Sequence, residues 1–325
     1  MLTSVGLLIF KVLVIVLVGW VFWPQFRWSE FADALARTSV GTALAVLTLF
    51  WFQAVMAALR WRWILRQLGY PLTSGATVEA WLVGQCASQI LPAVVGGDAA
   101  RIIRLRRYHV PTTAALVSVV VDRFTGFVAL VVLSAFTVPL LTAYKNKLIP
   151  DEIFWVVGLS CLLVGILLLS LRWTANASVF RRIPRLAQVQ AALRAVRPTK
   201  EALLVFGLVG LGTNMTVIIS AFLLGRELTP LMDLYSCFAI LPLVSLLTFI
   251  PISIAGWGVR EALMMSAFAL IDVPATDALA VSIKLGLANL ALGLIGGIVW
   301  IVLPAKEMPS EAPPEAMMGH SDRSA

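Results

Sequence analysis

The sequence predicts an all-α polytopic membrane protein with about six spanning helices and two re-entrant or broken helical hairpins related as an inverted repeat. Three observations lead to this fold class. The chain of 325 residues is 60% apolar and only 13% charged, whereas soluble domains carry about 25% charged residues. The basic residues cluster beside long apolar runs, and glycine and proline interrupt two of those runs. Most of the chain is therefore expected to lie in lipid.

Eight apolar stretches approach the length of about 20 residues that a membrane crossing needs. They cover residues 5–23, 40–59, 77–97, 112–139, 153–171, 202–224, 234–255 and 278–303. The loops decide which stretches cross, because Lys and Arg gather on the cytoplasmic side. Loops 60–66, 101–107 and 172–200 are strongly basic, while the other loops are mixed or acidic.

The charge pattern favours six crossings. If all eight stretches crossed, loops 60–66 and 101–107 would lie on opposite faces. If 77–97 enters and leaves on one side, all three basic loops become cytoplasmic. The same arrangement for 234–255 places both termini in the cytoplasm. We predict that both stretches are re-entrant, with a kinked spanning helix as the alternative for each.

Each re-entrant stretch contains a turn rich in proline and glycine. The turns read Leu91-Pro92-Ala93-Val94-Val95-Gly96-Gly97-Asp98 and Ile250-Pro251-Ile252-Ser253-Ile254-Ala255-Gly256-Trp257-Gly258. Proline removes a backbone donor, and glycine adopts conformations closed to other residues. Such backbone persists at membrane depth only against protein or a watery cavity, so we expect both turns to line a central cavity.

The segments around the two turns match in kind and oppose each other in direction. Inverted repeats with broken helices near the midplane are a recurring transporter design. We therefore expect one integral membrane domain over residues 1–304, with half-repeats at about 40–139 and 202–303. Residues 305–325 lack apolar periodicity and are predicted to be a disordered cytoplasmic tail.

Charged residues within the apolar stretches are candidates for binding a head group, because charges in lipid usually face a cavity or a partner. Asp98 is placed to cap a helix that begins after the double glycine. The free amides of that helix, together with Arg101, would attract a phosphate. Gly256, Gly258 and Arg260 are placed to build a similar pocket in the second half.

Structural ion pairs are the alternative explanation of the same charges, for example Asp98 with Arg123 or Glu261 with Lys284. The candidate head-group residues are Pro92, Gly96, Gly97, Asp98, Arg101, Asp122, Arg123, Pro251, Ser253, Gly256, Gly258, Arg260, Glu261 and Lys284. The three cysteines and two histidines lack the spacing of metal ligands, so neither a metal nor a cofactor is expected.

These motifs together resemble a known family, the membrane domain of lysylphosphatidylglycerol synthases, which is also called flippase-like. The resemblance lies in Leu91-Pro92 to Gly96-Gly97-Asp98 and Arg101, in Asp122-Arg123 with Gly126, and in Pro251-Ile252-Ser253 to Gly256-Trp257-Gly258-Val259-Arg260-Glu261. It implies a lipid translocase fold in the bacterial inner membrane, with both loops and their arginines on the lipid head group. Bifunctional synthases add a soluble lysyl-transfer domain. Only residues 304–325 follow the last stretch here, so lysyl transfer is not expected and the lipid need not be lysylphosphatidylglycerol.

The leading functional hypothesis is an inner-membrane lipid translocase that moves a phosphate-bearing phospholipid or lipid-linked intermediate through a central cavity. The alternatives are a membrane-embedded transferase on a lipid-linked substrate and a noncatalytic partner subunit of a lipid or envelope biosynthesis enzyme. The chain is not expected to be an enzyme, because no catalytic constellation is recognised. The expected partners are anionic or phosphate-bearing lipids and not nucleic acid. A second copy of the chain and a lipid-biosynthetic enzyme are further candidates.

Overall fold

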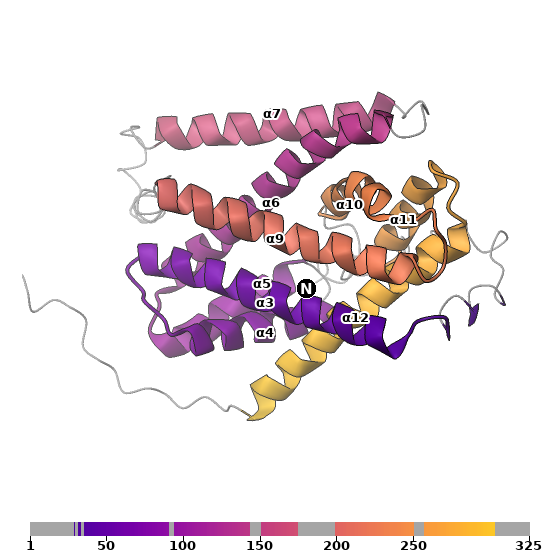
Figure 1. Cartoon of the computed structure of the whole chain (residues 1–325). Coiled ribbons are helices and arrows are strands. Elements are labelled where there is room, and N and C mark those ends of the chain that lie inside the picture. Colours follow the sequence, from indigo (N-terminus) through magenta and orange to yellow (C-terminus); the bar gives the residue numbers. More distant parts are fainter. Residues whose placement is uncertain are drawn as a thin grey trace, which may run out of the picture.

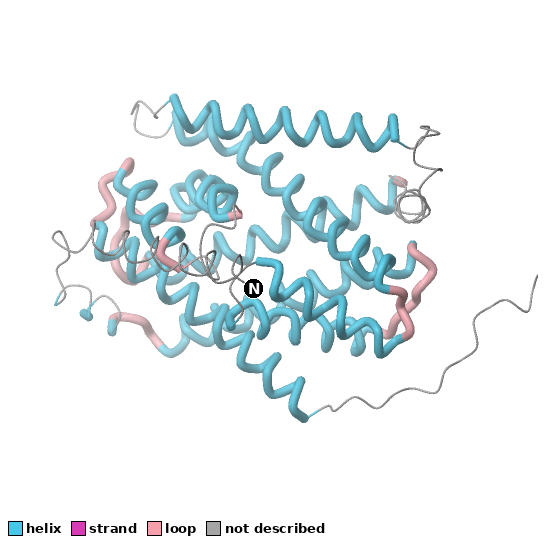
Figure 2. Tube along the Cα trace, turned by 180° about the vertical axis from the view of Figure 1, so that it is seen from behind, coloured by secondary structure: helices cyan, strands magenta, loops and turns pink. Residues whose placement is uncertain are grey.

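The computed structural model describes residues 29, 32–33, 36–90, 94–143, 151–174, 199–249 and 257–302, and these residues are largely helical (Figure 1). In chain order the helices are α3 (Val40–Gln67), α4 (Ser74–Ile90), α5 (Val94–Leu105), the 3-10 helix η2 (Arg106–Tyr108), α6 (Thr112–Ala143), α7 (Asp151–Thr174), α9 (Lys200–Gly225), α10 (Leu234–Thr248), α11 (Val259–Ala269) and α12 (Ala275–Val302). Turns gather at the two ends of the helix bundle (Figure 2).

Four helices, α3, α6, α9 and α12, are long and apolar enough to cross a membrane. They match four of the six predicted crossings. α7 covers the fifth and packs against α6 at the edge of the bundle (Figure 1). The first predicted crossing, 5–23, and the predicted tail, 305–325, lie outside the described residues. Large apolar side chains are exposed along the long helices, among them Phe136, Leu208 and Ile298, which suits a surface in contact with lipid.

The first stretch predicted to re-enter forms a helical hairpin. α4 and α5 are 17 and 12 residues long, shorter than the roughly 20 residues of a crossing. They run antiparallel: Gly97 near the start of α5 packs on Gly84, and Arg104 near its end pairs with Glu79. The chain therefore reverses here, which excludes a single kinked helix. α10 and α11, of 15 and 11 residues, likewise pack against each other in the second half.

The double glycine lies inside a helix, not in the turn before it. α5 begins at Val94, so the prediction that Asp98 caps a helix starting after Gly97 is wrong. The reason is close packing. A Cβ on Gly97 would lie 2.6 Å from the carbonyl oxygen of Gly84, so the glycines are needed where the two helices approach. The turn residues 91–93 and 250–256, with the candidates Pro92, Pro251, Ser253 and Gly256, lie outside the described residues.

α3 is longer than the apolar run that predicted it. It continues to Gln67, so Arg60, Arg62 and Arg66 are helical and do not form the expected loop. Arg60 is buried, and Arg62 donates from Nε to the carbonyl oxygen of Leu72 at 2.7 Å. The charge ended the apolar run in the sequence, but it did not end the helix.

The same helix pairs remain in contact when the two half-repeats are exchanged, with α3 for α9, α4 for α10, α5 for α11 and α6 for α12. α3 packs on α9, α4 packs on α12, and α10 packs on α6. Within each half, α5 packs on α6 as α11 packs on α12. Each hairpin therefore packs against the last helix of the other half.

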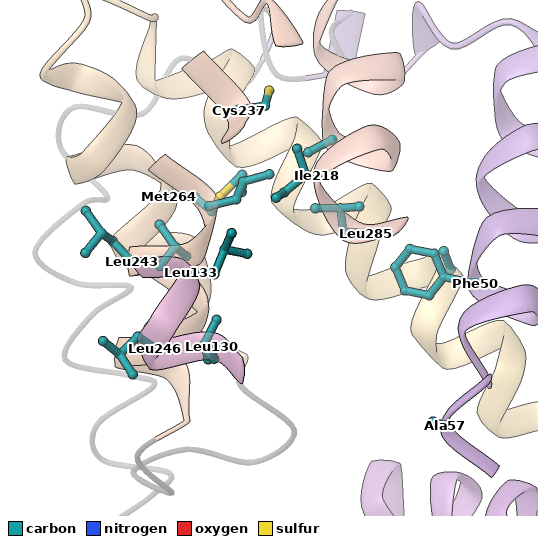
Figure 3. Packing of buried hydrophobic residues seen from close by; sticks show 14 of the residues in the cluster. Phe50, Ala57, Leu130, Leu133, Ile218, Cys237, Leu243, Leu246, Met264 and Leu285 are labelled. Atoms are coloured by element: carbon teal, nitrogen blue, oxygen red, sulfur yellow. The ribbon is translucent and has the colours of Figure 1, made fainter. Parts of the chain in front are cut away.

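The helices that join the halves run antiparallel. Ser39, just before α3, binds Glu227, just after α9, while Trp63 near the end of α3 meets Phe206 near the start of α9, edge to face at 5.2 Å. α6 and α10 also run antiparallel, because Leu133 lies beside Leu243 and Leu130 beside Leu246 (Figure 3). This second contact is part of the buried apolar core.

Glycines of α12 make its contact with α4 close. A Cβ on Gly296 would overlap the carbonyl oxygen of Leu82, and one on Gly293 would lie 2.9 Å from Cγ of Gln89. Gln85, which lies between Leu82 and Gln89 on α4, donates to Asn289 of α12. Because lipid supplies no hydrophobic drive between helices, small residues and interhelical hydrogen bonds of this kind stabilise the contact.

Candidate functional site

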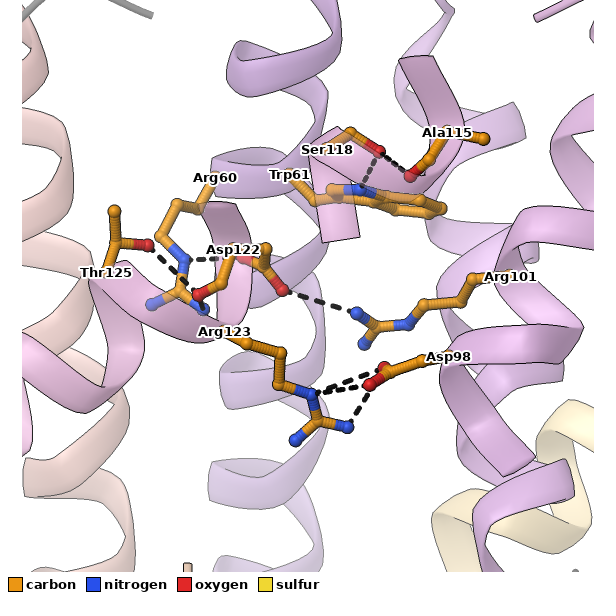
Figure 4. A network of polar contacts seen from close by, with 9 residues as sticks. All are labelled: Arg60, Trp61, Asp98, Arg101, Ala115, Ser118, Asp122, Arg123 and Thr125. Carbon is orange, nitrogen blue, oxygen red and sulfur yellow. Dashed lines mark hydrogen bonds and ion pairs between the residues drawn. The ribbon is translucent and has the colours of Figure 1, made fainter. Parts of the chain in front are cut away.

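A network of ion pairs joins α3, α5 and α6 (Figure 4). Oδ1 of Asp122 accepts from Nε of Arg60 at 2.8 Å, and Oδ2 accepts from Nη1 of Arg101 at 3.2 Å. The side chains of these three residues are 5–8% exposed. Asp122 lies ten residues after Thr112, which is about 15 Å along the helix axis. One carboxylate thus holds two guanidinium groups deep in an apolar bundle, where an unbalanced charge is costly.

Two aromatic rings contact the guanidinium of Arg101, and a glycine on the neighbouring helix leaves room for its side chain. Its guanidinium carbon lies 5.2 Å from the ring centre of Trp61 and 5.3 Å from that of Trp81. Trp61 in turn donates from Nε1 to Ser118 Oγ at 3.1 Å. A Cβ on Gly84 would lie 2.6 Å from Cγ of Arg101, so the glycine leaves the room that the arginine fills. These contacts fix the position of the guanidinium.

Arg123 and Asp98 form a second, more exposed pair beside Asp122 (Figure 4). Nε of Arg123 donates to both carboxylate oxygens of Asp98, at 3.2 and 3.0 Å, and Nη2 donates to Oδ1 at 3.0 Å. The Arg123 side chain is 39% exposed and that of Asp98 is 17% exposed. The ion pair that was the alternative explanation of these two residues is therefore present.

The second network lies on α11 and α12. Oε1 of Glu261 accepts from Nη2 of Arg260 at 2.6 Å, and Ser282 Oγ accepts from Nε of Arg260 at 3.1 Å. The Arg260 guanidinium carbon lies 5.0 Å from the ring centre of Trp257. A Cβ on Gly286 would overlap this guanidinium. The arrangement repeats that of Arg101: an arginine over tryptophan, beside a glycine of a neighbouring helix.

Gly258 and Glu261 also define the start of α11. Gly258 has φ 82°, a conformation that favours glycine, and its backbone N donates to Oε2 of Glu261 at 2.6 Å. A carboxylate in the first turn satisfies an amide that the helix leaves unpaired. Glu261 thus accepts hydrogen bonds both from the backbone at the start of α11 and from Arg260.

Lys284 of α12 is electrostatically coupled to Glu227 and Asp277. Glu227, in the loop after α9, accepts from Ser39 N at 3.1 Å, Ser39 Oγ at 2.7 Å and Thr42 Oγ1 at 2.7 Å. Partial burial by itself raises the pKa of Glu227, but these hydrogen bonds outweigh it and hold that pKa below its ordinary value. Glu227 therefore joins the loop after α9 to the first turn of α3.

The structure brings Asp98, Arg101, Asp122 and Arg123 together, and it groups Gly258, Arg260 and Glu261 separately. The sequence did not identify residues that complete the networks, namely Arg60, Trp61, Trp81 and Ser282. One signal for Arg60 was present. Ala57, Trp61 and Ile64 are buried and continue the helical spacing of α3 past the charge. No group of three or more metal-ligating side chains occurs within the described residues.

Comparison with known proteins identifies the family. The family model described as the lysylphosphatidylglycerol synthase TM region matches residues 8–297. No curated protein matches the chain. The predicted family is therefore confirmed. The matched residues include both hairpins and both arginine networks. A match of this extent, on a helical bundle with four helices long enough to cross a bilayer, shows that the chain is a multi-pass membrane protein of the lysylphosphatidylglycerol synthase transmembrane-region family, which indicates a role in lipid metabolism or transport.

Proposed function

We propose that this protein is a lipid translocase of the bacterial inner membrane that moves a phosphate-bearing phospholipid or lipid-linked intermediate between leaflets. The observation that carries the proposal is the repeated arginine. Arg101 and Arg260, one in each half, both lie over tryptophan and beside a glycine of a neighbouring helix. Guanidinium groups bind phosphate oxygens by charge-assisted hydrogen bonds, and family membership favours a lipid as the cargo.

The two halves are proposed to be an inverted repeat. The exchange of equivalent helix contacts supports a two-fold relation. The antiparallel packing of α3 and α9 supports an axis in the membrane plane, because an axis along the helices would make that pair parallel. Such repeats alternate access by rocking one half against the other. With both termini in the cytoplasm, the two arginines would approach the midplane from opposite faces.

The head group would enter between the two halves while the acyl tails stay in lipid. Arg123, the most exposed arginine of the first network, would meet the phosphate first, and Arg260 would receive it from the other half. Asp98 and Glu261 are the ion-pair partners of these two arginines when no cargo is bound. The proposed reaction is binding and release, with no bond made or broken.

Reconstituted vesicles test the proposal. Arg101→Gln and Arg260→Gln should each lower the flipping of a fluorescent phospholipid at least about tenfold, since each removes a charge-assisted contact to phosphate. Arg66→Gln, at an exposed arginine of α3, is the matched control and should flip at the wild-type rate. A double variant of Arg101 and Arg260 that stays folded, by size-exclusion profile and melting temperature, yet flips normally would refute the mechanism.

Labelling tests the orientation. Cysteine placed at Arg106, exposed after α5, should react with an impermeant maleimide only after permeabilisation, and cysteine at Pro230, exposed after α9, should react on intact cells. Cys161 is exposed and is replaced by serine in both variants. Reaction of the Arg106 site from outside the cell would overturn the proposed topology.

A further inference from the structure

The network around Asp122 contains one more cation than anion. Its ion pairs join three arginines, Arg60, Arg101 and Arg123, to two aspartates, Asp98 and Asp122. Asp122, Arg123 and Asp98 all act electrostatically on Arg101, and Arg60 shares Asp122 with it, so the two pairs form one electrostatic unit. With all five groups ionised, this unit carries one net positive charge. An uncompensated charge inside an apolar bundle is costly, and a bound anion relieves that cost.

The excess charge is reachable at only one place in this unit. Arg60 and Arg101 are each 8% exposed in their side chains, whereas Arg123 is 39% exposed. Both carboxylate oxygens of Asp98 accept hydrogen bonds from Nε and Nη2 of Arg123. The two non-bridging oxygens of a phosphate match the same two donors. An arriving phosphate therefore competes with Asp98 for Arg123 while the negative charge of Asp98 stays nearby.

We infer that the α5–α6 site selects a head group with a single negative charge, a phosphodiester, and that Asp98 is the residue that sets this preference. The inference rests on the proposed function and deepens it. One negative charge brings the unit to neutrality. A phosphate monoester carries about −1.5 to −2 at neutral pH, which leaves the unit negative and in repulsion with Asp98.

The other network does not share this property. Arg260 and Glu261 form a balanced pair on α11, so neither sign of charge is in excess there. The preference for a single charge is therefore assigned to the first half of the chain.

Two lipids with the same fluorescent acyl chain test the inference: phosphatidylglycerol, a phosphodiester, and phosphatidic acid, a phosphate monoester. In proteoliposomes at pH 8 the wild-type protein should flip phosphatidylglycerol about tenfold faster than phosphatidic acid. Asp98→Asn should lower this ratio to near one or below, because it adds one net positive charge to the unit. Asp98→Glu should keep the wild-type ratio, and so should Glu201→Gln, an exposed acid at the start of α9. An unchanged ratio in folded Asp98→Asn would overturn the inference.

A second measurement needs no variant. The second proton of a phosphate monoester is lost with a pKa of about 6, so phosphatidic acid at pH 5 carries nearly one charge. Its flipping, divided by that of phosphatidylglycerol at the same pH, should rise about tenfold between pH 8 and pH 5. Equal flipping of both lipids at both pH values would refute charge selection but leave the proposed translocase standing. Flipping of neither lipid above protein-free vesicles would instead refute the proposed translocase.

Discussion

The two arginine networks place a guanidinium inside an apolar bundle in different ways. The carboxylate beside Arg101 is Asp122, which belongs to another helix and also holds Arg60 of a third. The carboxylate beside Arg260 is Glu261, the next residue of the same helix. The first network therefore joins three helices through ion pairs, whereas the ion pair of the second lies within α11 and reaches α12 only through Ser282. The location of the acid decides whether an ion pair joins different helices or neighbouring residues of one helix.

The largest effect is expected from Asp122→Asn. It would leave two buried guanidinium groups without their carboxylate, and breaking a buried pair costs about 3–5 kcal/mol. In a chain of this size that corresponds to a fall of about 4–7 °C in melting temperature. Thermal unfolding of the detergent-solubilised protein measures it.

The matched change in the second network is Glu261→Gln. Its partner Arg260 is 17% exposed and keeps Ser282 as an acceptor, so we expect a loss nearer to 1 kcal/mol. If Glu261→Gln destabilised the protein as much as Asp122→Asn, the contrast between a cross-helix and a local pair would be wrong.

Alanine substitutions of the glycines beside the two arginines, Gly84 and Gly286, are expected to differ in stability, and the larger of the two effects is intermediate. In Gly84→Ala the new methyl group would lie 3.0 Å from the carbonyl oxygen of Gly97, backbone that cannot swing away, and overpacking of this kind costs about 1–3 kcal/mol. In Gly286→Ala the three atoms nearest to the new methyl group belong to the side chains of Arg260 and Trp257, which can move. We expect this variant to stay near wild-type stability and to lose lipid flipping.

The control for both glycine variants is Gly207→Ala. Gly207 lies within α9 with nothing within 4 Å of an added Cβ. Alanine there should leave flipping unchanged and raise stability by up to about 1 kcal/mol, the difference in helix propensity. Equal melting temperatures for Gly84→Ala and Gly286→Ala would show that Arg101 is no more tightly enclosed than Arg260.

The smallest effect concerns the contact between the halves rather than either network. The pKa of Glu227 is lowered in the folded protein, so its contribution to stability is fully present above the ordinary carboxyl range and is lost as the pH falls through the lower, folded-state value. Glu227→Gln should lower the melting temperature slightly at pH 7, and the difference from wild type should disappear in acid. A difference that persists unchanged at pH 3 would contradict the assigned role of its ionised form.

The sequence predicted the helical class, four long helices and the first chain reversal, because those depend on apolar length and on glycine and proline. The predicted helix start at Asp98 was wrong, because a glycine pair usually breaks a helix. Here the pair lies inside α5, and Gly97 packs closely on Gly84. The sequence does not indicate Arg60, because that charge ends the apolar run although the helix continues to Gln67. Trp61 and Trp81 could not be found from sequence at all, since their role depends on how α3, α4 and α5 meet in space.

Each hairpin packs on the last helix of the other half, and this sets the order in which native contacts can form during synthesis. Gln85 of α4 and Asn289 of α12 are separated by 204 positions in the chain. At a synthesis rate of about 5–20 residues per second, roughly 10–40 s pass before the ribosome delivers the partner of α4. During that interval α4 cannot make its native contact with α12. A nascent chain arrested before α12 would therefore leave α4 without this contact.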